Sequence, residues 1–154
     1  MSPKLQDEIR QDKPFGSLQA EVFLNLVRTA DALGRGAEAI LKLAGLSQPQ
    51  YNVLRILRGA GEQGLCCHEI AERMITRDPD ITRLVDRLER RGLVARARDG
   101  HDRRVILVRI TAAGRKVLRD LDRPMAEYNR KLLSHMHKDD LRRLVELLEA
   151  ARET

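Results

Sequence analysis

Arg83, Arg87 and Arg90 recur at spacings of four and three residues, so on an α-helix their guanidinium groups share one face. A guanidinium is always charged, and its planar fork of donors can bind a phosphate or the O6/N7 edge of guanine with two hydrogen bonds. The apolar residues of the same segment fall on the opposite side of the helix: Ile81, Leu84, Val85 and Leu88. The pattern predicts a helix that rests on a core and presents arginines to a polyanion.

Polar residues with other chemistry flank these arginines. Thr82 lies beside them, Asp80 occupies the outer side of the first turn, and Asp86 stands among them. Asp86 has two interpretations. It either pairs with Arg83 or Arg90 and holds their forks in place, or it accepts a hydrogen bond from a cytosine amine.

The charge around this helix is basic and comes from arginine alone. Residues 77–110 hold ten arginines, no lysine and six acidic residues, and so carry +4 of the chain's formal net charge of +6. An ordinary solvent-facing helix mixes lysine with glutamate, so this composition favours nucleic-acid contact over a merely solvated face. Four aromatic residues and no tryptophan argue against a stacking platform for single strands, so a duplex is the expected partner.

A second basic segment forms the tip of a predicted hairpin. The dipeptide Asp99-Gly100 is typical of a tight hairpin turn, because glycine tolerates a positive φ. Arg103 and Arg104 follow, and Asp102 is expected to orient one of them. A basic hairpin beside an arginine-faced helix would lie along the minor groove of a duplex, and a solvated hairpin tip is the alternative.

Periodicity and capping signals predict the elements that position these segments. Ser47 and Gln50 have the pattern of a capping box. Asp78 and Pro79 predict the N-cap and first position of the arginine-bearing helix, which Gly92 ends. The expected helices lie at about 17–44, 47–58, 67–75, 79–91, 111–132 and 138–152, and the expected strands at 93–98 and 104–110. The order α-α-α-α-β-β-α-α, mainly α with a small β-hairpin wing, is that of a winged helix-turn-helix.

The 154 residues are expected to form one domain preceded by an arm. Residues 1–16 mix charges with two prolines and predict a loosely held N-terminal arm. Within 17–154, residues 46–110 would form a DNA-binding lobe, and 17–45 with 111–154 a helical dimerisation region. The helices of that region carry more apolar surface than the lobe can cover, which predicts a homodimer.

Composition and motifs exclude several classes of protein. The longest apolar run is four residues, too short for a membrane span, and the acidic start is not a secretory signal. Two adjacent cysteines cannot form a disulfide framework, so a reduced, cytoplasmic protein is expected. The common nucleophile, metal and dinucleotide motifs are missing from the sequence, so neither catalysis nor a cofactor is expected.

Cys66 and Cys67 precede a short predicted helix. The spacing of Cys66 and Glu69 resembles a capping box in which sulfur replaces a hydroxyl. Because a helix N-terminus lowers the pKa of a thiol, a redox-sensing regulator that uses these cysteines is an alternative. A metal site is disfavoured, since no second Cys/His pair lies at zinc-site spacing. A winged helix used only for protein interaction is the remaining alternative.

Three motifs together resemble the MarR family of bacterial regulators: Ile81-Thr-Arg-Leu-Val-Asp-Arg-Leu-Glu-Arg-Arg-Gly-Leu-Val94, Asp102-Arg-Arg104 and Ile110-Thr-Ala-Ala-Gly114. The resemblance covers about residues 20–150. It implies a transcription regulator, with repression the expected mode, that acts as an obligate two-fold dimer with intertwined terminal helices on a palindromic operator. At matching positions it implies these DNA contacts: Thr82, Arg83, Arg87, Asp102, Arg103 and Arg104.

The resemblance also implies, for many members, release from DNA by a small phenolic or amphipathic effector. That ligand would bind between the dimerisation helices and the DNA-binding lobe. The chain departs from the family pattern in the turn Ile75 to Pro79 and at Gly100, where proline is frequent. The peroxide-sensing branch carries its reactive cysteine in the first helix, where this chain has none, which weakens the redox alternative.

Overall fold

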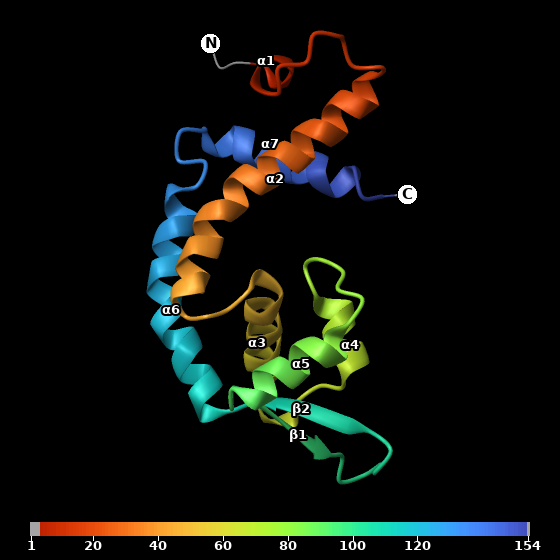
Figure 1. Cartoon of the computed structure of the whole chain (residues 1–154), viewed down its shortest axis with the longest axis vertical. Helices are drawn as coiled ribbons and strands as arrows, with labels where there is room; N and C mark the ends of the chain where they lie inside the picture. Colours follow the sequence, from red (N-terminus) through yellow and green to blue (C-terminus); the bar gives the residue numbers. More distant parts are fainter. Residues whose placement is uncertain (1–3, 154) are drawn as a thin grey trace.

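A computed structural model describes residues 4–153 of the chain. Figure 1 shows the long helices gathered at one end of the molecule and a smaller lobe with a two-stranded hairpin at the other. In chain order the elements are α1 (Leu5–Glu8), α2 (Leu18–Leu43), α3 (Gln48–Ala60), the 3-10 turn η1 (Gly61–Gln63), α4 (Cys67–Arg73), α5 (Ile81–Arg90), β1 (Val94–Arg98), β2 (Ile106–Ile110), α6 (Ala112–Lys131) and α7 (Lys138–Ala150). The predicted mainly α fold with a hairpin wing is confirmed, and the structure adds α1.

Helix α1 lies inside the segment predicted as an arm. Leu5 is buried, with 5% of its surface exposed. At the end of α1, Glu8 Oε2 lies 3.3 Å from Arg28 Nε of α2. Residues 4–10 are therefore tied to the long helices, and residues 1–3 of the predicted arm lie outside the described residues.

Three helices begin where the sequence predicts them, because a hydroxyl caps each start. The side chains of Ser17, Ser47 and Thr111 each accept the backbone N–H three residues on. At α3 the capping box is complete, since Gln50 Oε1 accepts the Ser47 N–H at 3.0 Å. Thr111 Oγ1 also donates to the Gly92 carbonyl at 2.6 Å, which joins the start of α6 to the end of α5.

One hydrophobic core joins the lobe to the long helices. Its fully buried side chains come from all major elements except α7: Leu41, Val53, Leu54, Leu57, Ile70, Val85, Leu88, Val94, Val108 and Leu118. Helices α2 and α6 approach closely at Gly36, where a Cβ would overlap the ring of Tyr128. The Tyr128 hydroxyl donates to the carbonyl of Leu33 in the preceding turn of α2. Helix α6 continues through Pro124.

The hairpin is antiparallel, with Arg96 opposite Val108. Leu65 pairs with the outer edge of β2, since it exchanges two backbone hydrogen bonds of 3.0 and 2.8 Å with Val108. The hairpin tip lies where the sequence predicts it, but the positive φ expected at Gly100 is wrong. Gly100 has no positive φ, and the loop spans 99–105, closed by a 2.9 Å hydrogen bond from the Asp99 N–H to the Val105 carbonyl.

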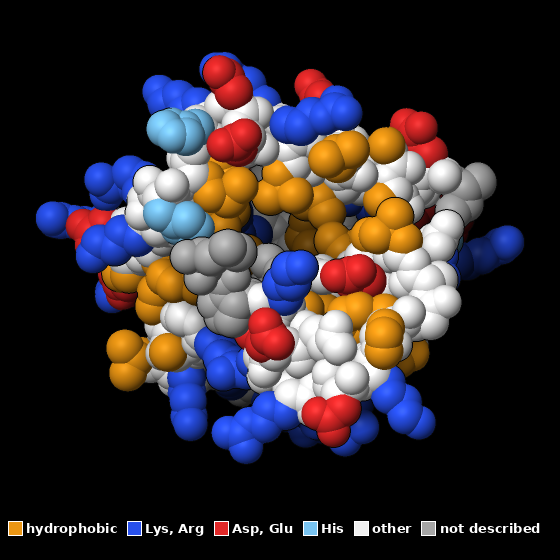
Figure 2. All heavy atoms as spheres, turned by 90° about the horizontal axis from the view of Figure 1, so that it is seen from above, with side chains coloured by type: hydrophobic (Ala, Val, Ile, Leu, Met, Phe, Trp, Pro, Cys, Tyr) orange, Lys and Arg blue, Asp and Glu red, His pale blue; other side chains and the backbone are white. Residues whose placement is uncertain are grey.

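Apolar side chains remain exposed on α2 and α7, as the sequence predicts. Leu18 is 71%, Phe23 63% and Val145 53% exposed. The view in Figure 2 shows apolar side chains around a hollow that is rimmed by charged groups. A groove of about 620 Å³ lies between α2 and α7 and is lined by residues that include Leu26 and Leu148. Within residues 4–153, no helix combines the length and the apolar character that a bilayer crossing requires.

Candidate nucleic-acid interface

Helix α5 begins later than the sequence predicts. Asp80, not Asp78, is the N-cap, because its Oδ1 accepts the Arg83 N–H at 3.0 Å. The Asp78 carboxylate instead accepts the Asp80 N–H at 2.8 Å, in the turn before the helix. Helix formation starts at Ile81, the first member of the buried stripe, so packing selects between two carboxylates that could both cap.

The two faces of α5 are those predicted. Its buried residues are Ile81, Leu84, Val85 and Leu88. Thr82, Arg83, Arg87 and Arg90 are exposed on the other side. Among residues 4–153, no carboxylate lies within ion-pair distance of these three guanidinium groups. The helix therefore presents three arginines whose charge is available to an anion.

One interpretation of the sequence predicted that Asp86 pairs with Arg83 or Arg90, but in the structure it does not. Its Oδ1 lies 2.6 Å from Nη1 of Arg96, which comes from strand β1. The same nitrogen lies 3.1 Å from Glu89 Oε1. Desolvation by burial lowers the pKa of Arg96, but its interactions with Asp86 and Glu89 raise it, so the pKa lies above its ordinary value. The sequence interpretation considered only partners on the same helix, whereas the hairpin supplies the partner.

The wing tip carries the second group of exposed cations, Arg103 and Arg104. Asp102 was expected to orient one of their guanidinium groups, but its Oδ1 accepts the backbone N–H of Arg104 at 3.0 Å. Arg98 Nη1 donates to the carbonyl of Arg103 at 2.9 Å. These contacts fix the backbone of the loop, and both arginine side chains are exposed.

The structure thus brings together the two basic segments of the sequence. In Figure 1 the hairpin follows directly after α5 and lies beside it, and the Arg96 contacts join the two elements. Five exposed arginines, from α5 and from the wing tip, form what we call the arginine surface: Arg83, Arg87, Arg90, Arg103 and Arg104. A helix and an adjacent hairpin of this kind can contact a groove and the flanking phosphates of a duplex.

Two arginines that sequence reasoning missed connect the lobe to the long helices. Arg91, just after α5, donates to the carbonyls of Gly45 and Ala44 at 2.7 and 2.9 Å. Arg58 of α3 makes a two-pronged ion pair of 2.9 and 3.0 Å with Asp122 of α6, and its hydrogen bond to that carboxylate raises the pKa of Arg58. The partners lie 46 to 64 residues apart, so no local pattern signals either contact.

A cavity of about 520 Å³ opens between α2, α3 and α6. Its lining is mostly apolar and aromatic and includes Tyr51, Met125 and Tyr128, with Asn52 and the charged groups of Arg55 and Glu38. The Arg55 guanidinium lies 5.8 Å from the centre of the Tyr51 ring. The cavity can take a flat apolar body, with Arg55 and Glu38 as the charged groups of its lining.

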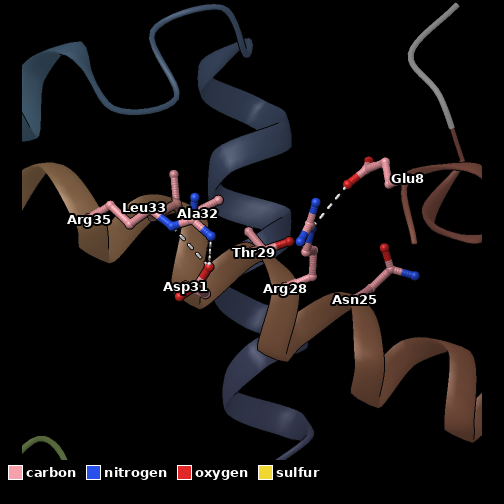
Figure 3. A pocket seen from close by; sticks show the side chains of 8 residues that line it. All are labelled: Glu8, Asn25, Arg28, Thr29, Asp31, Ala32, Leu33 and Arg35. Atoms are coloured by element: carbon pink, nitrogen blue, oxygen red, sulfur yellow. Dashed lines mark hydrogen bonds and ion pairs between the residues drawn. The ribbon is translucent and has the colours of Figure 1, made fainter. Parts of the chain in front are cut away.

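A smaller pocket of about 290 Å³ lies along α2 and is shown in Figure 3. Its two arginines are already paired, Arg28 with Glu8 at 3.3 Å and Arg35 Nε with Asp31 at 3.1 Å. The pocket therefore offers no uncompensated charge for a ligand.

Cys66 and Cys67 are both partly buried and free of disulfides. Cys66 caps α4, and its backbone N–H donates to Glu69 Oε1 at 3.3 Å, as the capping-box interpretation predicts. Hydrogen bonds from the Cys66 side chain and backbone lower the pKa of the Glu69 carboxyl. Within the described part of the chain, no group of three or more His, Cys, Asp or Glu residues could hold a metal ion.

Comparison with known proteins places this surface in context. Residues 46–106 match the model of the MarR family. The chain is 35% identical over 106 residues to the HTH-type transcriptional regulator TtmR of Methylorubrum extorquens, a match that covers 69% of this chain and 53% of that protein. The chain thus spans about half the length of that relative.

Solved structures extend the likeness to nearly the whole chain. A MarR transcription factor from Planctomyces limnophilus is 42% identical, with a TM-score of 0.67, over 89% of this chain and 99% of that one. NadR, solved in complex with 4-hydroxyphenylacetate, is 25% identical, with a TM-score of 0.71, over 92% of this chain and 100% of that one.

Proposed function

The chain belongs to the MarR family of transcription regulators, and from this premise we propose that it binds double-stranded DNA with sequence preference and regulates transcription in the cytoplasm. The observation that carries the proposal is the arginine surface, formed by five exposed arginines on two adjoining elements. A helix that merely faces solvent, or a wing that contacts only protein, has no need of this density of guanidinium groups.

Each element has a distinct role in this proposal. Helix α5 enters the major groove, where Thr82, Arg83 and Arg87 face base edges and Arg90 binds phosphate. The wing tip places Arg103 and Arg104 along the flanking minor groove. The three acids named from the sequence act indirectly, because each makes an internal contact that orients this surface: Asp80, Asp86 and Asp102.

A homodimer on a palindromic operator is the proposed assembly. The support comes from the groove of about 620 Å³ between α2 and α7 and from the exposed apolar residues around it. Burial of such a face against a second copy removes apolar surface from water and places two α5 helices for two half-sites. A dimer that covers a promoter excludes the polymerase, so repression is the proposed mode.

We also propose that a small phenolic or otherwise amphipathic acid controls DNA binding. The cavity between α2, α3 and α6 is lined by the aromatic rings of Tyr51 and Tyr128 and holds one cation, Arg55, and one carboxylate, Glu38. Arg55 could pair with a ligand carboxylate that lies away from Glu38. The ligand in the NadR structure, 4-hydroxyphenylacetate, has this chemistry. The cavity lies where the lobe helix α3 meets the long helices α2 and α6, so an occupant would change their relative position.

A thiol-based sensor at Cys66 and Cys67 gains no support from the relatives. The capping box explains the presence of Cys66, and the partial burial of both side chains restricts access by an oxidant.

The proposed function is tested by selecting bound duplexes from a random-sequence pool and then measuring affinity for the recovered operator. Arg83→Ala should weaken binding to that operator by roughly 1–3 kcal/mol and relax selection at one position of each half-site. Arg123→Ala is the matched control, because Arg123 is an exposed arginine on α6 away from the arginine surface. Equal affinity of the wild type for the selected duplexes and the unselected pool would contradict the proposal.

A further inference from the structure

Within residues 4–153, Arg96 is the wing residue with the most hydrogen bonds and ion pairs to α5. Its Nη1 lies 2.6 Å from Asp86 Oδ1 and 3.1 Å from Glu89 Oε1, and its Nη2 donates to the Thr82 carbonyl at 3.3 Å. Its backbone N–H donates to the second Glu89 oxygen at 3.0 Å. One residue of β1 therefore contacts three successive turns of the helix, at positions 82, 86 and 89.

The Arg96 contacts also determine on which side of α5 its two carboxylates lie. Asp86 and Glu89 are the two acids within α5. Asp86 lies three residues from Arg83 and four from Arg90, close enough along the helix to pair with either, whereas Glu89 has no exposed arginine of α5 at these spacings. Arg96 draws both carboxylates to the side of the helix that faces β1. The Arg96 side chain is only 22% exposed, so it is itself poorly placed to reach a phosphate.

We propose that Arg96 is a positioning residue for DNA binding, which keeps Asp86 and Glu89 away from the DNA and from the guanidinium groups of the arginine surface. Without Arg96, two uncompensated carboxylates would lie on the recognition helix. Asp86 would then pair with Arg83 or Arg90, and both carboxylates would repel the phosphates of an approaching duplex. The inference rests on the proposed function, since it concerns how the same surface binds DNA.

The test measures binding of purified full-length variants to a labelled duplex of about 30 base pairs, by fluorescence anisotropy over a range of salt concentrations. Arg96→Gln should weaken binding about tenfold or more, and Arg96→Lys, which retains the charge, should weaken it less. The decisive variant combines Arg96→Gln with Asp86→Asn and Glu89→Gln. It should recover most of the lost affinity, because the carboxylates that oppose DNA are then neutral.

Arg58→Gln is the matched control for loss of an interhelical ion pair, because the Arg58–Asp122 pair lies outside the arginine surface. It should lower the melting temperature without a comparable loss of affinity. A merely structural role of Arg96 would lower the melting temperature, and the neutral triple variant would then remain as weak as Arg96→Gln.

Two further results would contradict the proposed role of Arg96, and a third would contradict the proposed function itself. If Arg96→Gln weakens binding and also lowers the slope of log affinity against log salt by about 0.9, with no recovery in the triple variant, Arg96 contacts a phosphate directly and the proposal is wrong. Equal binding by Arg96→Gln and the wild type would also overturn it. Failure of the wild type to bind any duplex at low salt would instead reject the proposed function.

Discussion

The guanidinium of Arg91 donates a 2.7 Å hydrogen bond to the carbonyl oxygen of Gly45, and a second one of 2.9 Å to Ala44. Arg91 directly follows the recognition helix α5, and the two carbonyls belong to the C-terminal end of α2. A cation thus satisfies the negative end of a long helix and joins it to the element that would read DNA. The contact thus ties the end of α5 to the end of α2.

Arg91→Ala should reduce the free energy of unfolding by about 1 kcal/mol, because two charge-assisted hydrogen bonds are lost from an exposed site. Urea unfolding measures the change. Arg90→Ala is the neighbouring control, since the Arg90 side chain makes no ion pair among the described residues and should change stability by no more than about 0.5 kcal/mol. Equal effects of the two substitutions would show that the Arg91 contact contributes nothing.

Gly34 and Gly36 should respond to alanine in opposite directions. A Cβ at Gly34 would meet nothing within 4 Å, so Gly34→Ala should stabilise α2 by about 0.5–1 kcal/mol. A Cβ at Gly36 would overlap the Tyr128 ring, so Gly36→Ala should destabilise by about 1–3 kcal/mol through overpacking. Thermal melting of the pair distinguishes the two cases, and stabilisation by Gly36→Ala would contradict the close approach of α2 and α6.

The Glu69 capping box should give stability that depends on pH. Hydrogen bonds from Cys66 lower the pKa of Glu69 below its ordinary value of 4.5, so its contribution is present at neutral pH. The contribution is lost as the pH falls below 4.5 and through the lowered pKa. The difference in Tm between wild type and Glu69→Ala should therefore shrink between pH 7 and pH 3, as circular dichroism would show.

Glu69→Gln is the control for that experiment, because an amide oxygen can fill the same capping position without titrating. The difference in Tm between Glu69→Gln and Glu69→Ala should stay constant with pH. A constant difference between wild type and Glu69→Ala would rule out the proposed cause.

Replacement of Arg103 and Arg104 by alanine should weaken duplex binding and flatten its salt dependence. Each phosphate contact that is lost lowers the slope of log affinity against log salt by about 0.9. Arg119 and Arg123 on α6 provide a control pair with the same change in net charge, and their replacement should leave the slope unchanged. An unaltered slope in the wing variant would mean that the wing does not touch DNA.

Much of the fold follows from local signals in the sequence. Hydroxyls at Ser17, Ser47 and Thr111 mark helix starts, because a cap and its partner lie only three residues apart. The apolar stripe of α5 is equally local, since it depends on helical periodicity alone. These features predicted the helix order and the outward-facing arginines.

Contacts that depend on tertiary packing escaped prediction. Arg96 lies ten residues from Asp86, on a different element, and only the packing of β1 against α5 makes it a better partner than Arg83 or Arg90. The choice between Asp78 and Asp80 as N-cap has the same origin, because both residue types suit the role and the buried position of Ile81 decides. Neither the arginine surface's roles on DNA nor the domain division was tested by the fold, and both remain predictions.

Two contacts cover the edges of the hairpin and so affect its tendency to aggregate. Leu65 pairs with Val108 on one edge, and Glu89 accepts the Arg96 N–H on the other. Open strand edges invite a further strand and so promote aggregation and amyloid formation. In this hairpin a backbone segment occupies the middle of one edge, and a carboxylate occupies the middle of the other. This small, exposed sheet is thereby kept from recruiting strands from its neighbours.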